Sequence, residues 1–224
     1  TVTFKGKASH AAAHPAGGRS AFDALLLAMK GVEFMREHIS NDAKIHYAPI
    51  HAGHTPANIV PESSQGEFIL RCMRNSYLND MERRFKNIIE GAALMTGTTY
   101  DLEKGMGYKA CIPNQPLINL FYGNAALAGA ERIVPPRDKT GSTDFGDVMQ
   151  FAPGICARIA FAPKGTGAHS PEWLKIGKTE EAHQSIITAA KTIAGMAIDL
   201  IMNPELMQKI WEDYKIQLNK VNGS

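Results

Sequence analysis

The chain has 224 residues, with 24 lysine and arginine residues against 22 aspartate and glutamate residues, a formal net charge of +2 and 44% apolar residues. This composition excludes an intrinsically disordered chain, because enough apolar side chains are present to build a core. The near-zero net charge also argues against a protein that binds nucleic acids nonspecifically and against a polybasic membrane patch.

The spacing of apolar residues divides the first half of the chain into six segments. Strand-like segments are rich in β-prone residues or alternate apolar with polar residues, and helical segments repeat apolar residues every three or four positions. Strands are predicted at 1–8, 44–52, 66–74 and 98–109, and helices at 20–38 and 76–96. The order β-α-β-β-α-β is typical of a ferredoxin-like fold, a four-stranded antiparallel sheet with two helices on one face. Its free sheet edge or helix face could serve for dimerisation or be solvated.

A proline-containing stretch at 111–116 indicates a boundary, after which a second unit begins. The pattern there predicts a buried strand at 154–162 and helices at 116–131, 180–202 and 204–218. In the helix at 180–202, the apolar residues predicted to face inward are Ile186, Ile187, Ala190, Ile193, Ala197 and Leu200. A single strand cannot satisfy its own backbone hydrogen-bonding groups, so this unit is expected to be part of a domain.

The sequence contains no stretch approaching the ~18 consecutive apolar residues that span a bilayer, and its start lacks the apolar segment of a signal peptide. Its three cysteines, Cys72, Cys111 and Cys156, are far apart and suit neither a disulfide framework nor a zinc ribbon. We therefore expect a soluble, cytoplasmic protein that binds neither a membrane nor nucleic acid.

Three loops contain residue types suited to binding or catalysis. In the first, His10 and His14 precede Pro15, which favours an extended residue before it and so disfavours a helical pair of metal-binding histidines. A loop histidine among small residues can approach a ligand closely, although the loop could equally be packed by its alanines alone.

The second loop places His169 among glycines, directly after the predicted strand 154–162. Ligands of α/β proteins bind at the carboxyl ends of strands, and an exposed imidazole there could bind a metal. The third loop contains Ser142, Thr143 and Asp144, whose hydroxyls and carboxylate could bind a substrate or could form a turn that caps a helix.

Five motifs together resemble a known family. They are the run His10 to Ala24, Asn58-Ile59-Val60-Pro61, Arg71 closing a strand, Gly141-Ser142-Thr143-Asp144, and Gly167-Ala168-His169-Ser170. In this order and spacing they resemble the dinuclear metallopeptidases that include aminoacylase, carboxypeptidase G and succinyl-diaminopimelate desuccinylase. The first and fourth motifs look most like the amidohydrolase branch that contains the B-type component of aminobenzoyl-glutamate hydrolase. The resemblance covers essentially the whole chain.

The resemblance implies two domains and a division of roles between them. Residues 1–111 would form a dimerisation, or lid, domain, and residues 112–224 the C-terminal part of an α/β zinc-peptidase catalytic domain. His10 would stabilise the developing oxyanion in the partner's active site, and Asn58 and Arg71 would hold the carboxylate or carbonyl of the substrate. His169 would be a ligand of one of two Zn²⁺ or Mn²⁺ ions. The loop that contains Ser142, Thr143 and Asp144 would face the substrate.

The family's remaining metal ligands and its general base precede the lid domain and have no counterpart in this sequence. One histidine cannot hold two divalent ions, since a catalytic zinc usually has three protein ligands. We therefore expect a C-terminal portion, inactive alone, of a homodimeric amidohydrolase that could also pair with a related A-type component. Its substrate would be aminobenzoyl-glutamate or an N-acyl amino acid. The alternative is a dimerisation or binding module without hydrolytic activity.

Overall fold

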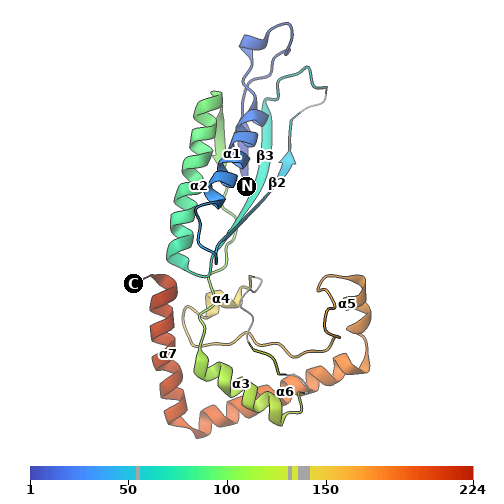
Figure 1. Ribbon diagram of the computed structural model, residues 1–224, viewed down its shortest axis with the longest axis vertical. Coiled ribbons are helices and arrows are strands. Elements are labelled where there is room, and N and C mark those ends of the chain that lie inside the picture. Colours follow the sequence, from blue (N-terminus) through green and yellow to red (C-terminus); the bar gives the residue numbers. More distant parts are fainter. Residues whose placement is uncertain (54–55, 131–132, 136–141, 224) are drawn as a thin grey trace. The chain divides into compact units, whose positions relative to one another are not determined.

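The structure is a computed structural model that describes residues 1–53, 56–130, 133–135 and 142–223. The chain folds into two compact units (Figure 1). The first comprises Thr1–Ala110 together with the residues from Val221 onward, and the second comprises Cys111–Lys220.

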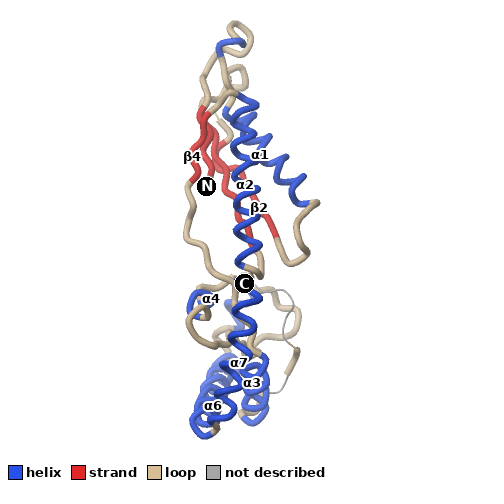
Figure 2. The backbone as a smooth tube through the Cα atoms, turned by 90° about the vertical axis from the view of Figure 1, so that its left-hand side faces the viewer, coloured by secondary structure: helices blue, strands red, loops and turns tan. Residues whose placement is uncertain are grey.

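The first unit has the predicted order β-α-β-β-α-β, which confirms the expected mixed fold. Its elements are β1 (Val2–Lys5), α1 (Ala21–Arg36), β2 (Lys44–His51), β3 (Ser63–Arg71), α2 (Asn75–Thr96) and β4 (Thr99–Leu102), with a short 3₁₀ helix, η1, at Pro15–Gly17. The strands form one sheet in the order β2-β3-β1-β4, and every neighbouring pair is antiparallel. This is the ferredoxin-like arrangement, with α1 and α2 packed on the sheet (Figure 2).

One hydrophobic core joins this sheet to both helices. Phe4 and Ile45 from the strands, Leu25 from α1, and Met81 and Ile89 from α2 are all fully buried. Burial of each such side chain contributes roughly 1.5–3 kcal/mol relative to its exposure to water. The sequence pattern predicts this core correctly because the apolar faces of both helices pack against strands that lie within the same 110 residues.

Two local signals fix the ends of the helices in this unit. Ser20 Oγ accepts a hydrogen bond of 3.1 Å from the Asp23 N–H at the start of α1. Gly97 follows α2 with a φ of 64°, and its N–H donates to the carbonyl of Leu94. This left-handed conformation is costly for residues with a Cβ atom, so glycine is favoured at the end of α2.

All regular elements among the described residues of the second unit are helices. Its elements are α3 (Gln115–Leu127), α4 (Phe145–Val148), α5 (Pro171–Ile176), α6 (Glu180–Met202) and α7 (Pro204–Asn222). Leu117, Met196 and Ile210 form the centre of a small core. The prediction of a strand at 154–162 is wrong for this chain, because no neighbouring strand is present among the described residues to form a ladder with it. This stretch instead belongs to the long loop between α4 and α5 (Figure 1).

The inward face predicted for α6 is also wrong for most of its residues, although Leu200 is half-buried and packs against the core as predicted. Ile186 and Ile193 are 64% and 66% exposed, whereas Thr192 on another face is 1% exposed. The buried face is set by contact with α3, where the Asn124 side chain lies against Gly195 and donates a 2.7 Å hydrogen bond to Asp199 Oδ2. The helix therefore buries a face of small and polar residues together with Met196, and it exposes its isoleucines.

α6 is also long and apolar enough to cross a membrane, with a mean hydropathy of 1.5. A search for consecutive apolar residues misses this helix because the charged residues Lys191 and Asp199 interrupt its apolar sequence. One such helix is weak evidence for a membrane span, since the core helix of a soluble protein meets the same criterion.

Candidate functional site

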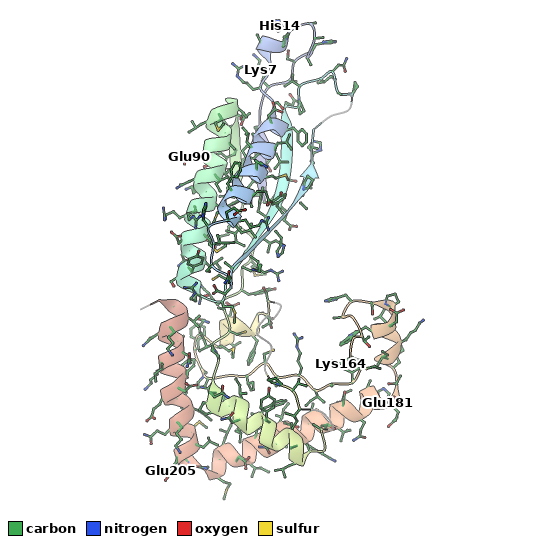
Figure 3. All side chains as sticks on the ribbon, viewed as in Figure 1. Lys7, His14, Glu90, Lys164, Glu181 and Glu205 are labelled. Atoms are coloured by element: carbon green, nitrogen blue, oxygen red, sulfur yellow. The ribbon has the colours of Figure 1, made fainter. Side chains whose placement is uncertain are left out.

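The structure brings the loop that follows β1 against the loop that precedes β3. His10 and Ile59 form an isolated antiparallel bridge, and the Ala11 N–H donates a 2.8 Å hydrogen bond to the carbonyl oxygen of Asn58. The Val60 N–H in turn donates to the Ser9 carbonyl at 2.8 Å. His10 and Asn58, which belong to two different sequence motifs, are thus held together by backbone hydrogen bonds. Figure 3 shows His14 at the far end of the same loop.

The base of this loop depends on a glycine. Lys7 and Arg19 exchange backbone hydrogen bonds of 2.8 and 2.9 Å across the loop. A Cβ atom at the adjacent Gly6 would lie 2.0 Å from the Arg19 carbonyl oxygen, a distance that no side chain could tolerate. The absence of a side chain at Gly6 therefore allows the two ends of the loop to close.

The backbone of the loop fixes the tautomer of neutral His10. Its Nδ1 atom accepts hydrogen bonds from the N–H groups of Ala12 and Ala13, at 3.3 and 3.1 Å. An acceptor nitrogen carries no proton in the neutral ring, so the proton resides on Nε2. The His10 side chain is exposed, and within the described chain Nε2 has no hydrogen-bond acceptor. The loop therefore presents an N–H donor to an external group.

Arg71 lies at the other end of the sheet. It is the last residue of β3, where it pairs with Lys44, whereas Ser63 at the start of β3 pairs with Lys5 beside the His10 loop. The nine residues of β3 span about 26 Å at ~3.3 Å per residue. Within this chain, Arg71 is therefore too far from His10 and Asn58 to share a small substrate with them.

His169 occupies the loop before α5 in an unusual backbone conformation. Its φ is 66°, and it is the one residue other than glycine with a positive φ in the described part of the chain. Such a conformation is uncommon outside glycine, and it accumulates at functional sites. Ser170 anchors the end of the loop, since its Oγ donates to the Gly167 carbonyl at 2.8 Å and accepts from the Trp173 N–H at 3.2 Å.

His169 also borders an open hollow of about 440 Å³. The hollow is lined by Ala168, His169, Ser170, Pro171, Trp173 and Leu174. Trp173 and Leu174 belong to none of the sequence motifs. The signal that would have found them is Ser170 followed by Pro171, a helix start that places the next turn beside the loop.

The third loop adopts a turn at the start of α4. The Thr143 Oγ1 accepts a 3.3 Å hydrogen bond from the Phe145 N–H and lies 3.3 Å from the Asp144 carboxylate. These contacts match the capping-turn interpretation of the sequence. Ser142 and Asp144 remain exposed, and Gly141, which begins the motif, lies outside the described residues.

The described residues do not form a complete metal site. Among residues 1–53, 56–130, 133–135 and 142–223, no three His, Cys, Asp or Glu side chains lie close enough together to hold an ion. A catalytic zinc usually requires three protein ligands. His169 is therefore a candidate for a single ligand, and the donor set available among these described residues does not fit a dinuclear centre.

Comparison with known proteins gives homologues over nearly the whole chain, although no family model matches it. Human Xaa-Arg dipeptidase is 30% identical over 224 residues, which cover 98% of this chain and 51% of that protein. The B-type component of the p-aminobenzoyl-glutamate hydrolase of Escherichia coli is 28% identical over 268 residues, covering 95% of this chain and 56% of that protein. The resemblance to this component indicated by the motifs is thereby confirmed.

A solved structure shares the fold. The aminobenzoyl-glutamate utilization protein from Klebsiella pneumoniae matches with a TM-score of 0.59 at 20% identity, covering 88% of this chain and 47% of that chain. The chain thus spans about half the length of the curated relatives that it matches.

Proposed function

We propose that this chain, a homologue of Xaa-Arg dipeptidase and of the B-type component of p-aminobenzoyl-glutamate hydrolase, is part of a cytoplasmic hydrolase that cleaves an amide bond next to a free carboxylate. The names of both relatives describe such substrates. A dipeptide ending in arginine and an aminobenzoyl-glutamate each join an acyl group through an amide to an amino acid with a free carboxylate. N-acyl amino acids belong to the same chemical class.

The observation that carries this proposal is the fixed tautomer of His10. During amide hydrolysis the carbonyl oxygen acquires negative charge, and a preorganised N–H donor stabilises it more than it stabilises the uncharged substrate. The Nε2–H of His10 is such a donor, because Ala12 and Ala13 occupy Nδ1 and leave the other nitrogen facing outward. Asn58, held next to His10 by backbone hydrogen bonds, would bind the same end of the substrate.

Arg71 supports a site shared between two protomers. Its guanidinium suits a carboxylate through two parallel hydrogen bonds, but the length of β3 separates it from His10 of the same chain. A substrate could be bound by Arg71 of one protomer together with His10 and Asn58 of another. This geometry favours a homodimer formed through the first unit, with a related A-type component as a second possible partner.

His169 and the loop of Ser142, Thr143 and Asp144 would complete the site. We assign His169 as one ligand of a divalent ion, Zn²⁺ or Mn²⁺, with the other ligands supplied by polypeptide outside this chain. Such an ion would supply an activated water when bound. The exposed hydroxyl of Ser142 and carboxylate of Asp144 would contact the polar part of the substrate.

The test compares two histidines of the same loop in the protein at the full length that its gene encodes. With p-aminobenzoyl-glutamate and a Xaa-Arg dipeptide as substrates, His10→Ala should lower kcat by about 10²- to 10³-fold, the typical loss for one oxyanion donor. His14→Ala, four residues further along, should lower it by less than about threefold, the scale of an exposed residue without a role in the transition state. Equal losses in the two variants, or an unchanged kcat in His10→Ala, would refute the role of His10.

The second candidate function is a dimerisation or binding module without hydrolytic activity. The observation that favours it is the self-contained first unit, which has its own core and an eight-residue edge strand, β2. A dimer of the full-length protein that hydrolyses neither substrate with added Zn²⁺ or Mn²⁺ would support this module over the hydrolase.

A further inference from the structure

Two cations lie directly opposite each other on the outer face of the sheet in the first unit. In the antiparallel pairing of β2 with β3, Lys44 is the partner of Arg71. The next residues, Ile45 and Leu70, pack into the core on the side of α1 and α2, so strand alternation directs Lys44 and Arg71 to the face opposite the helices. Both side chains are exposed, and residues paired in this way have Cβ atoms about 4.5–5.5 Å apart.

Within the described part of the chain, no carboxylate neutralises this pair. Neither Arg71 nor Lys44 forms an ion pair there. Asp42, the acidic residue nearest to Lys44 in sequence, is bound through both oxygens by Arg74. Glu67 shares the outer face, but it precedes Arg71 by four residues of β3, about 13 Å at ~3.3 Å per residue. Like charges directly opposite each other in a sheet repel, so an anion bound between them would relieve the repulsion.

Both cations retain hydrogen-bond donors for such an anion. Lys44 Nζ donates one hydrogen bond of 3.0 Å to the carbonyl oxygen of Asn41, which positions the ammonium and leaves two of its three N–H donors. The guanidinium of Arg71 has no hydrogen-bond partner among the residues that the structure describes, and its planar fork suits one carboxylate. The pair therefore offers donors for two carboxylates side by side.

We propose that Lys44 determines substrate specificity by binding the side-chain carboxylate of a substrate whose α-carboxylate is bound by Arg71. This inference rests on the proposed function, which assigns Arg71 to the free carboxylate. The two carboxylates of a glutamate are joined through three carbons, so they can reach two neighbouring donors. A substrate that ends in arginine would instead bring a third cation to the pair, and the repulsion would weaken its binding. Of the substrate classes that the relatives' names give, the amide of an acidic amino acid is the one that fits.

The experiment compares three substrates of the protein at the full length that its gene encodes. They are p-aminobenzoyl-glutamate, p-aminobenzoyl-glutamine, in which an uncharged amide replaces the side-chain carboxylate, and alanyl-arginine. Lys44→Met should raise KM for the glutamate substrate by about 10- to 100-fold, the scale of one hydrogen bond to a charged group, and leave kcat within about threefold. The KM for the glutamine substrate should change by less than about threefold, because this substrate has no second carboxylate to lose.

Three further variants separate the charge of Lys44 from a structural role. Lys44→Arg keeps the cation and should retain most of the preference for glutamate over glutamine. Lys44→Glu reverses the charge, so it should weaken binding of the glutamate substrate further and lower KM for alanyl-arginine. Lys86→Met, at an exposed position of α2, is the control and should alter none of these values. An equal rise of KM for both aminobenzoyl substrates in Lys44→Met would indicate a structural role and overturn the proposal.

The proposed function and this inference fail in different ways. Hydrolysis of the glutamate and glutamine substrates with equal KM by the wild-type protein would leave the hydrolase intact and overturn the role of Lys44. If none of the three substrates is hydrolysed, the proposed function fails, and calorimetry then decides whether p-aminobenzoyl-glutamate binds more tightly than p-aminobenzoyl-glutamine and loses this advantage in Lys44→Met. Absence of that advantage, or competition by inorganic phosphate as strong as that by glutarate, would overturn the proposal.

Discussion

Arg74 holds Asp42 through both oxygens of its carboxylate. The Nε and one terminal nitrogen of the guanidinium each donate a hydrogen bond of 3.2 Å, and the ring of Tyr77 lies beneath the guanidinium at 4.8 Å. These contacts tie the loop before β2 to the start of α2. The hydrogen bonds from Arg74 lower the pKa of Asp42 to about 2.

This pair predicts a specific pH dependence of stability. Because the pKa of Asp42 is depressed in the folded state, its contribution is complete above the unfolded value near 4 and disappears as the pH falls through about 2. Both side chains are partly exposed, so the contribution is about 1 kcal/mol rather than the full value that the shift would imply. Urea denaturation should find Asp42→Asn less stable than wild type by about this amount at pH 7, and the difference should shrink toward zero as the pH falls to 2 and below.

A matched control for this prediction is Asp101→Asn. Asp101 pairs with Lys5 on the sheet, but both side chains are more than half exposed, so solvent screens their interaction. The expected loss is within about 0.5 kcal/mol at any pH. A loss in Asp42→Asn that persists unchanged at pH 2 would contradict the assignment to the carboxylate charge.

The side chain of Asn114 forms hydrogen bonds to both α3 and α7. It is 2% exposed, its Oδ1 accepts the Leu117 N–H at 3.0 Å to begin α3, and its Nδ2 donates to the Ile210 carbonyl of α7 at 2.9 Å. Loss of a helix cap costs about 1 kcal/mol, and an unsatisfied buried group costs a further 1–3 kcal/mol.

Asn114→Ala should therefore lower the free energy of unfolding by about 2–4 kcal/mol. Asn114→Ser retains an oxygen for the cap and should lose about half as much. Ser170→Ala removes the cap of the six-residue α5, and should cost no more than about 1 kcal/mol because that cap is less buried. Equal losses in Asn114→Ala and Asn114→Ser, measured by thermal denaturation, would show that the link to α7 dominates over the cap.

The two units differ in how far their sequence predicts their structure. In the first unit the alternation around Phe4 and the helical repeat around Leu25 predict both the elements and the core, because every apolar face is covered by another local segment. In the second unit the same reasoning assigns Ile193 to the interior and residues 154–162 to a strand, and neither holds in this chain. Periodicity identifies a face that requires a partner, but it does not reveal whether the partner lies in the same polypeptide.

The sequence likewise predicts only part of the candidate site. Motif order alone selected His10, Asn58 and Arg71 as a group, and the antiparallel register of β1 with β3 then brought the first two together. The remoteness of Arg71 follows from the length of β3, and the predicted strand at 66–74 already contained that residue. The tautomer of His10 depends on a turn of the backbone at Ala12 and Ala13, which residue types alone do not specify.

The backbone of His169 gives a prediction that is independent of catalysis. At a φ of 66° the branched Cβ of valine clashes with the neighbouring peptide groups, whereas glycine adopts this conformation freely. His169→Val should therefore lower the free energy of unfolding by about 1–2 kcal/mol, while His169→Gly should change it by less than about 0.5 kcal/mol, since relief of strain offsets the greater entropy of the unfolded chain. Ala168→Val, at an exposed neighbour without a positive φ, is the control and should be close to neutral. Chemical denaturation of the four proteins ranks them directly. If His169→Val is as stable as Ala168→Val, the left-handed conformation is not maintained in solution, and the orientation of His169 toward its hollow is lost with it.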